Sequence, residues 1–208
     1  MRNLIIPSDA PWSVAPFAVI DIEGNGAQPP DLVELGLVRV DSGVLGGLTT
    51  WLVRPEQRIS PLVSRLHGIK NSDVEKAPLF DEIKTQVASA LRGRYLVAHN
   101  AAIDWSVLHR KLPTFEPGGV IDTLRLAKSL YPERSSYKLS DLLLDFELNK
   151  TLDGIDGGPH RAGYDTMAAA NLFIHLAQHS HRGPLLFGQV LNLGSLPQSS
   201  FELQQRLF

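Results

Sequence analysis

The chain has 208 residues, 43% of them hydrophobic and 20% charged, which is enough to bury one ordinary core in a soluble globular domain. Its formal net charge of −2 excludes a strongly basic surface, so metal ions and a few local Lys or Arg side chains would have to hold any nucleic acid. The absence of cysteine excludes disulfides, thiolate metal ligands and a cysteine nucleophile, and leaves oxygen and imidazole chemistry.

The start of the chain does not have the pattern of a targeting segment. Its first residues, MRNLIIPSDAPW, are interrupted by proline, serine and aspartate before a signal-peptide core develops. No apolar stretch approaches the roughly 20 residues that span a bilayer. We therefore expect a cytoplasmic protein.

Three strands are predicted to open the fold. Residues 16–26 form an apolar run that ends in glycines, which indicates a buried strand followed by a turn. Residues 31–40 and 44–53 alternate with period two and flank Asp41, Ser42 and Gly43, which are typical hairpin residues. We expect these three strands to pair antiparallel.

Helices and two further strands are predicted to follow. Apolar residues at helical spacing indicate a helix over residues 79–93, with Gly93 as its C-cap. The other expected elements are a helical turn over 59–69, a strand over 94–100, a helix over 101–112, a strand leading into a helix over 118–132, a helix over 137–146 and a long helix over 162–179. This order predicts an α/β fold, a mixed sheet with helices on its faces.

The two ends of the chain differ in composition from the middle. Helical periodicity fades after Arg182, where glycine, proline and serine accumulate. We therefore predict a domain over residues 16–181, an N-terminal extension over 1–15 and a C-terminal tail over 182–208.

One acidic pair stands out in the first strand. Residues two apart on a strand face the same way, so Asp21 and Glu23 project together from its end. Gly24 and Gly26 would let a ligand approach the backbone there. Taken alone, such a pair is more often an acidic strand end facing solvent.

Two further acids are predicted at helix starts. Asp104 lies in the first turn of the helix after the fourth strand, and Asp165 opens the last long helix, five residues after His160. Taken alone, each acid would be explained by the favourable interaction of a carboxylate with the N-terminal end of a helix dipole. His160 taken alone would be an ordinary loop histidine. Gathered together, like carboxylates repel, so such a site usually binds divalent cations.

The combination is more specific than its parts. The segments DIEG, HNAAIDWSVL and HRAGYDT, in this order, resemble the three motifs of the DEDDh (DnaQ-like) 3′–5′ exonuclease superfamily. LHGI at residues 66–69 is similar to a further stretch of that family, and the resemblance extends over roughly residues 16–179. It implies a ribonuclease H-like fold, whose mixed five-stranded sheet has three antiparallel strands, then two parallel, flanked by helices.

The resemblance also implies roles. Asp21 would bridge two divalent cations, Glu23 and Asp165 would complete the first cation site, and Asp104 would support the second. His160 would act as general base, since histidine titrates near neutral pH. Oxygen ligands suit Mg²⁺ or Mn²⁺, and two such cations can clamp the scissile phosphate and stabilise the leaving 3′-oxygen.

Departures from the family pattern affect substrate contacts. Gly24 and Asn25 stand where many members carry hydroxyl residues, and Ile103 stands where an aromatic residue is common, which puts substrate preference in doubt. The predicted substrate-binding residues are Gly24, Asn25, Gly26, His67, His99, Asn100 and Ile103. For the two histidines and Asn100, structural hydrogen bonding in turns is the alternative.

The last five residues, QQRLF, resemble the Gln-x-x-Leu-Phe peptide by which bacterial replication and repair proteins bind the sliding clamp. Gln204, Leu207 and Phe208 would make this contact, with the apolar pair inserted into a hydrophobic pocket. The alternative is an amphipathic turn that folds back on the core of the domain.

The leading hypothesis is a 3′–5′ exonuclease that releases nucleoside monophosphates from single-stranded or frayed DNA, in proofreading or repair. One alternative is an exoribonuclease or oligoribonuclease that trims RNA 3′ ends, which would read the terminal 2′-hydroxyl. A second is a non-catalytic module that binds nucleic-acid ends. An internally cutting nuclease of the same fold is disfavoured by the spacing of His160 and Asp165.

Overall fold

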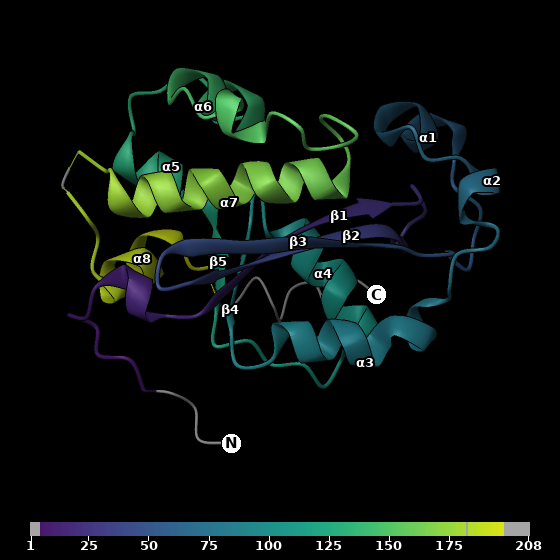
Figure 1. The fold of residues 1–208 in the computed structure, drawn as a ribbon, viewed down its shortest axis with the longest axis horizontal. Helices are drawn as coiled ribbons and strands as arrows, with labels where there is room; N and C mark the ends of the chain where they lie inside the picture. Colours follow the sequence, from purple (N-terminus) through teal and green to yellow (C-terminus); the bar gives the residue numbers. More distant parts are fainter. Residues whose placement is uncertain (1–4, 182, 198–208) are drawn as a thin grey trace.

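A mixed five-stranded sheet with helices on both faces organises the molecule in a computed structural model, which describes residues 5–181 and 183–197 (Figure 1). The strands are β1 (Phe17–Gly24), β2 (Leu32–Asp41), β3 (Val44–Leu52), β4 (Tyr95–Ala98) and β5 (Val120–Asp122), in the order β3-β2-β1-β4-β5. The first three strands pair antiparallel, whereas β4 and β5 join β1 in parallel. The predicted fold class is confirmed.

Four helices lie in the connections from β3 to β5, one helical turn precedes β1, and the other helices follow β5. In chain order they are η1 (Trp12–Val14), α1 (Pro61–His67), α2 (Asn71–Val74), α3 (Phe80–Leu91), α4 (Ala102–Lys111), α5 (Thr123–Leu130), α6 (Leu139–Asp145), η2 (Asn149–Leu152), α7 (Ala162–Gln178) and α8 (Phe187–Gly194). The short elements η1, α2 and η2 were not predicted, and every predicted helix is present with shifted ends. Among the described residues, no helix is both long and apolar enough to cross a membrane.

Side chains of β1 alternate between two cores, one on each face of the sheet. Ala18 and Ile20 pack with α3 and α4, whereas Phe17 and Val19 pack with α5, α7 and α8. Because Asp21 and Glu23 continue the register of Phe17 and Val19, they lie on the α7 face, beyond the apolar core. The first half of β1 therefore contributes buried core residues, and its second half contributes residues of the candidate site.

A glycine in β2 lets α7 approach the sheet closely. Gly36 pairs with Asp21, and a Cβ at Gly36 would lie 2.2 Å from the Thr166 hydroxyl oxygen and 2.4 Å from the Ala162 carbonyl oxygen. Any larger residue would therefore push the first turns of α7 away from β1 and β2. This close contact places the start of α7 beside the end of β1.

The prediction that helical structure ends before Arg182 is wrong for Phe187–Gly194, which form α8. Phe187 and Val190 are buried in the same core as α5 and α7, and packing explains why a segment with weak helical propensity is helical. Trp12, in the predicted N-terminal extension, is also buried and packs edge-on against Phe173. The division of the chain at residues 16 and 181 stays a prediction.

Candidate active site

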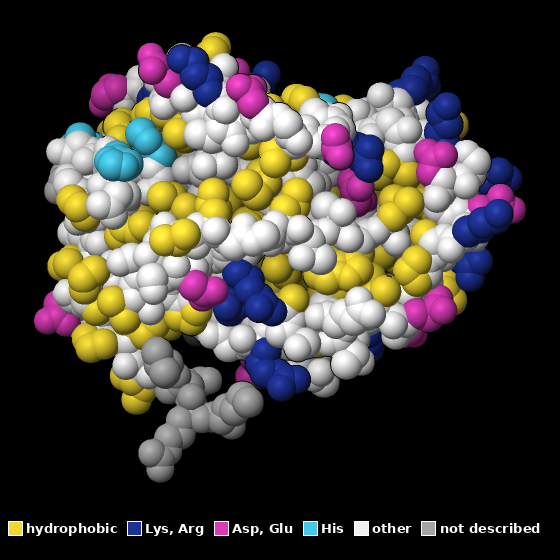
Figure 2. Space-filling model, viewed as in Figure 1, with side chains coloured by type: hydrophobic (Ala, Val, Ile, Leu, Met, Phe, Trp, Pro, Cys, Tyr) yellow, Lys and Arg dark blue, Asp and Glu magenta, His cyan; other side chains and the backbone are white. Residues whose placement is uncertain are grey.

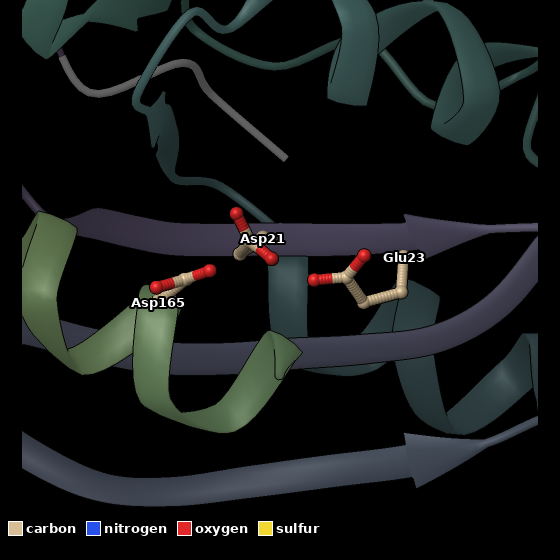
Figure 3. Close-up of side chains that lie close together, drawn as sticks. All are labelled: Asp21, Glu23 and Asp165. Carbon is tan, nitrogen blue, oxygen red and sulfur yellow. The ribbon is translucent and has the colours of Figure 1, made fainter. Parts of the chain in front are cut away.

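Three carboxylates from two elements meet on the α7 face of the sheet. Asp21 and Glu23 project from β1, and Asp165 from the first turn of α7. One carboxylate oxygen of each lies within 4.8 Å of the others, and Figure 3 shows the three groups turned toward a common space. The structure therefore brings together acids that are 144 residues apart in the sequence, by the difference between positions 165 and 21.

Asp104 joins this cluster from the opposite direction. It lies in the first turn of α4, is 6% exposed, and its Oδ1 accepts a hydrogen bond of 2.9 Å from the Ile22 amide. Ile22 stands between Asp21 and Glu23, so Asp104 is held at the same end of β1. All four predicted acids therefore lie in one region.

Burial raises the pKa of all four acids. Burial, followed by repulsion from neighbouring acids, raises the pKa of Asp21 well above its usual value and that of Glu23 to about 8. Burial also raises the pKa of Asp104 to about 7, against the opposing Ile22 amide, and raises that of Asp165 against the opposing His160 amide. A compensating positive charge would favour the ionised form of each of these carboxylates.

The donor set fits a hard divalent cation. Asp21, Glu23 and Asp165 offer only oxygen atoms, at a separation that one ion can bridge. Among the described residues, neither Asp21 nor Glu23 accepts a hydrogen bond from the protein, so their oxygens are available as ligands. The arrangement fits a site for a divalent cation.

His160 lies in the loop between η2 and α7, directly beside this cluster. Its backbone N–H donates a 2.9 Å hydrogen bond to Oδ2 of Asp165, and its exposed side chain lines a groove together with Asp165. Its φ of +63° is a left-handed conformation that few side chains adopt, and such strain concentrates at functional sites. The structure thus places the predicted base next to a predicted metal ligand.

Glu34 is a site residue that the sequence analysis missed. It pairs with Glu23 across β1 and β2 and is 5% exposed. Its carboxylate accepts bonds of 2.6 and 3.1 Å from the Arg161 guanidinium and of 2.9 Å from the Ala162 amide. Arg161 follows His160, so Glu34 anchors both the His160 loop and the start of α7. The available signal was a carboxylate between the apolar residues Val33 and Leu35 in the first half of the strand.

The side chain of Asn25 shapes the glycine-rich turn after β1. Asn25 is fully buried, and its Oδ1 accepts bonds from the Ala27 and Asp31 amides while its Nδ2 donates to the Gln57 carbonyl. Both polar atoms of its side chain therefore take part in the turn, and its contact with substrate stays a prediction. Gly24 ends β1, and Gly26 has a φ of +79°, where a Cβ would lie 2.6 Å from Ser60 Oγ. Substrate contact by these two glycines stays a prediction.

The remaining predicted substrate residues differ in their exposure to solvent. His67 is 3% exposed, its Nδ1 accepts from the Ile69 amide, and burial lowers its pKa against the opposing Gly24 carbonyl. His99 and Asn100 line the groove beside His160, and Ile103 is 56% exposed on α4. Their contact with substrate stays a prediction. Gln204, Leu207 and Phe208, predicted to bind a clamp, lie outside the described residues.

Comparisons with known proteins agree with this geometry. The sequence matches the RNase T family model, described as "Exonuclease", over residues 18–173. It is 30% identical over 175 residues to the 3′–5′ exonuclease DinG of Staphylococcus haemolyticus, covering 81% of the chain. It is 34% identical over 167 residues, 78% of the chain, to a PolC-type DNA polymerase III of Caldanaerobacter subterraneus subsp. tengcongensis. The chain spans only 19% and 12% of the lengths of these two relatives.

Two solved structures have the same fold. Exonuclease X in complex with 5′-overhanging duplex DNA superposes with a TM-score of 0.66 at 30% identity, covering 77% of this chain and 90% of that one. A 3′-exonuclease that recognises a histone mRNA stem-loop superposes with a TM-score of 0.64 at 17% identity, covering 81% and 83%. The second likeness bears on the fold alone. Together the comparisons support exonuclease chemistry at a divalent-metal site.

Proposed function

The chain belongs to the RNase T family of exonucleases, and on this premise we propose that it is a metal-dependent 3′–5′ exonuclease. It would release nucleoside monophosphates from 3′ ends of single-stranded or frayed DNA, in proofreading or repair. The observation that carries the proposal is the convergence of Asp21, Glu23 and Asp165 within 4.8 Å, beside His160.

The site residues would have different roles in metal binding and proton transfer. Asp21, Glu23 and Asp165 would hold one cation, and Asp104 would help hold a second. Bound Mg²⁺ or Mn²⁺ would neutralise these carboxylates and polarise the scissile phosphate. His160 would accept the proton of the attacking water, and the Asp165 carboxylate keeps the backbone of this histidine in place. Stepwise addition of each cation to metal-free protein, with the hydrolysis rate as readout, tests the number and identity of the ions.

End-labelled DNA tests the proposal directly. A single-stranded oligonucleotide labelled at its 5′ end should give a ladder that shortens from the 3′ end, and EDTA should stop it. Asp21→Asn should be inactive while still folded, and Lys84→Gln on α3 is the matched surface control. Cleavage at internal positions, or full activity of Asp21→Asn, would contradict the assignment. Tight binding of DNA ends without hydrolysis at any metal concentration would favour the non-catalytic alternative.

RNA remains the alternative substrate. Exonuclease X, at 30% identity, is seen with DNA, which favours DNA for this chain. Matched DNA and RNA oligonucleotides of one sequence decide between them, with kcat/KM as readout. A preference for RNA would replace the proofreading role with RNA 3′-end trimming.

Recruitment by a sliding clamp is part of this proposal, on the sequence of the last five residues alone. Deletion of Leu207 and Phe208 should abolish binding to the clamp and leave hydrolysis of short oligonucleotides intact. Unchanged clamp binding by the truncated protein would remove this part of the proposal.

A further inference from the structure

A groove of about 820 Å³ leads away from the candidate active site. His160 and Asp165 line it together with His99 and Tyr137, and Lys128 on α5 and Lys138 at the start of α6 line it as well. Three serines add hydroxyl groups to the same wall. The groove therefore connects the acidic cluster to two positive charges.

The two lysines are available to an external anion. Both are exposed, and among the described residues no carboxylate lies within ion-pair distance of either ammonium group. Asp141 attracts Lys138 electrostatically, but its carboxylate also accepts bonds from Ser136 and Ser140. The Lys128 ammonium lies 5.6 Å from the centre of the Tyr137 ring, a cation–π distance that keeps it at the groove wall.

The wall that carries Lys138 is fixed to the sheet next to the active site. His99 Nε2 donates a 3.1 Å hydrogen bond to the Tyr137 carbonyl, and His99 Nδ1 accepts one of 2.9 Å from the Thr123 hydroxyl. Burial lowers the pKa of His99, which favours this neutral, doubly bonded state. The Tyr137 hydroxyl donates to the Tyr131 carbonyl at 2.7 Å. The segment is therefore held in position before any ligand arrives.

We propose that this groove binds the phosphodiester backbone of the substrate strand upstream of the scissile bond, with Lys128 and Lys138 each contacting a phosphate. The inference rests on the proposed exonuclease function. A chain of net charge −2 needs local cations to hold a polyanion, and the face in Figure 2 shows Lys and Arg interspersed with Asp and Glu rather than a continuous basic surface. His99 is a positioning residue in this arrangement, since its ring holds the Tyr137 backbone.

A comparison of two substrates distinguishes an effect on upstream binding from an effect on the hydrolysis step. A single-stranded 12-mer occupies the whole groove, whereas the p-nitrophenyl ester of thymidine 5′-monophosphate has one phosphodiester and nothing upstream. The variant Lys128→Gln/Lys138→Gln should raise KM for the 12-mer and leave hydrolysis of the ester within twofold of wild type. Each lost phosphate contact should reduce the slope of log(kcat/KM) against log[salt] by about 0.7, so the double variant should lose about 1.4.

Lys84→Gln is the control, because it removes one half-exposed lysine, paired with Asp81, from α3 on the opposite face of the sheet. It should leave the salt slope unchanged. A slope change below about 0.3 in the double variant, or an equal loss on the ester and the 12-mer, would overturn the groove assignment. Failure of the wild-type protein to hydrolyse either substrate would instead refute the exonuclease proposal, and this inference with it.

Discussion

Replacement of Gly36 by alanine should separate α7 from the sheet and inactivate the site. The added Cβ would lie 2.4 Å from the Ala162 carbonyl oxygen, whereas ordinary contacts begin near 3.4 Å, so the start of α7 must retreat by about 1 Å. Rotation of Thr166 relieves its own contact at 2.2 Å but cannot move the carbonyl of Ala162. Overpacking of this kind costs about 1–3 kcal/mol of unfolding free energy.

The effect on activity should exceed the effect on stability. Asp165 lies in the first turn of α7, so the retreat carries its carboxylate away from Asp21 and Glu23. A misplacement of about 1 Å at a catalytic constellation reduces rates by about 10²-fold. We therefore expect Gly36→Ala to be folded, with kcat on a single-stranded oligonucleotide lowered about a hundredfold and with weaker Mn²⁺ binding.

Gly47→Ala on β3 is the matched control, because a Cβ at Gly47 meets nothing within 4 Å. Urea unfolding measures the stability of both variants, and release of nucleotides measures their activity. A folded Gly36→Ala protein with activity within threefold of wild type would refute the claim that this contact positions Asp165.

Other perturbations should separate the roles of the remaining residues. Glu34→Gln should cost about 1–3 kcal/mol in urea unfolding, because it leaves Arg161 without its anionic partner, and should lower kcat more than it raises KM. Asp21→Asn should lower the hydrolysis rate by about 10³-fold or more, yet raise the melting temperature of the metal-free protein, because it removes a carboxyl group whose charged form is disfavoured by burial and by the neighbouring acids. The pKa of Glu23 is raised from 4.5 to about 8, so the native state binds this proton more tightly than the unfolded chain. The unfolding free energy of metal-free protein should therefore fall as pH rises from about 4.5 to about 8, and calorimetry with and without Mg²⁺ should show the cation reversing that fall. His160→Gln should lower kcat by about 10²- to 10⁴-fold with unchanged Mn²⁺ affinity, and a loss of affinity would assign His160 to metal binding instead.

Local patterns in the sequence were enough to place each acid on its element. The period of a strand puts Asp21 and Glu23 on one face, and helix-start preferences put Asp104 and Asp165 in first turns, as the structure confirms. No local rule says that these four positions meet, because their approach depends on sheet order and on the contact at Gly36. The resemblance to a family supplied that step.

Features that depend on long-range partners escaped the sequence analysis. Glu34 lies 127 positions from Arg161, and nothing near either residue reveals the pairing. Asn25 was interpreted as a substrate contact because its amide can donate and accept, but the turn it closes uses those groups. Helix α8 was missed because Gly188 weakens its local signal, while burial of Phe187 and Val190 stabilises it.

The hydrogen bonds around the acidic cluster indicate which charges the protein compensates for itself. Glu34 has Arg161, Asp104 has the Ile22 amide and Asp165 has the His160 amide. Among the described residues, no donor serves Asp21 or Glu23, and repulsion from the other acids adds to burial in raising the pKa of both. The protein therefore compensates the charges of Glu34, Asp104 and Asp165 with its own donors, whereas the charges of Asp21 and Glu23 require an external cation. Cation binding should for this reason stabilise the fold. For this reason Asp21, rather than Asp104 or Asp165, is the position where loss of activity and gain of metal-free stability should coincide.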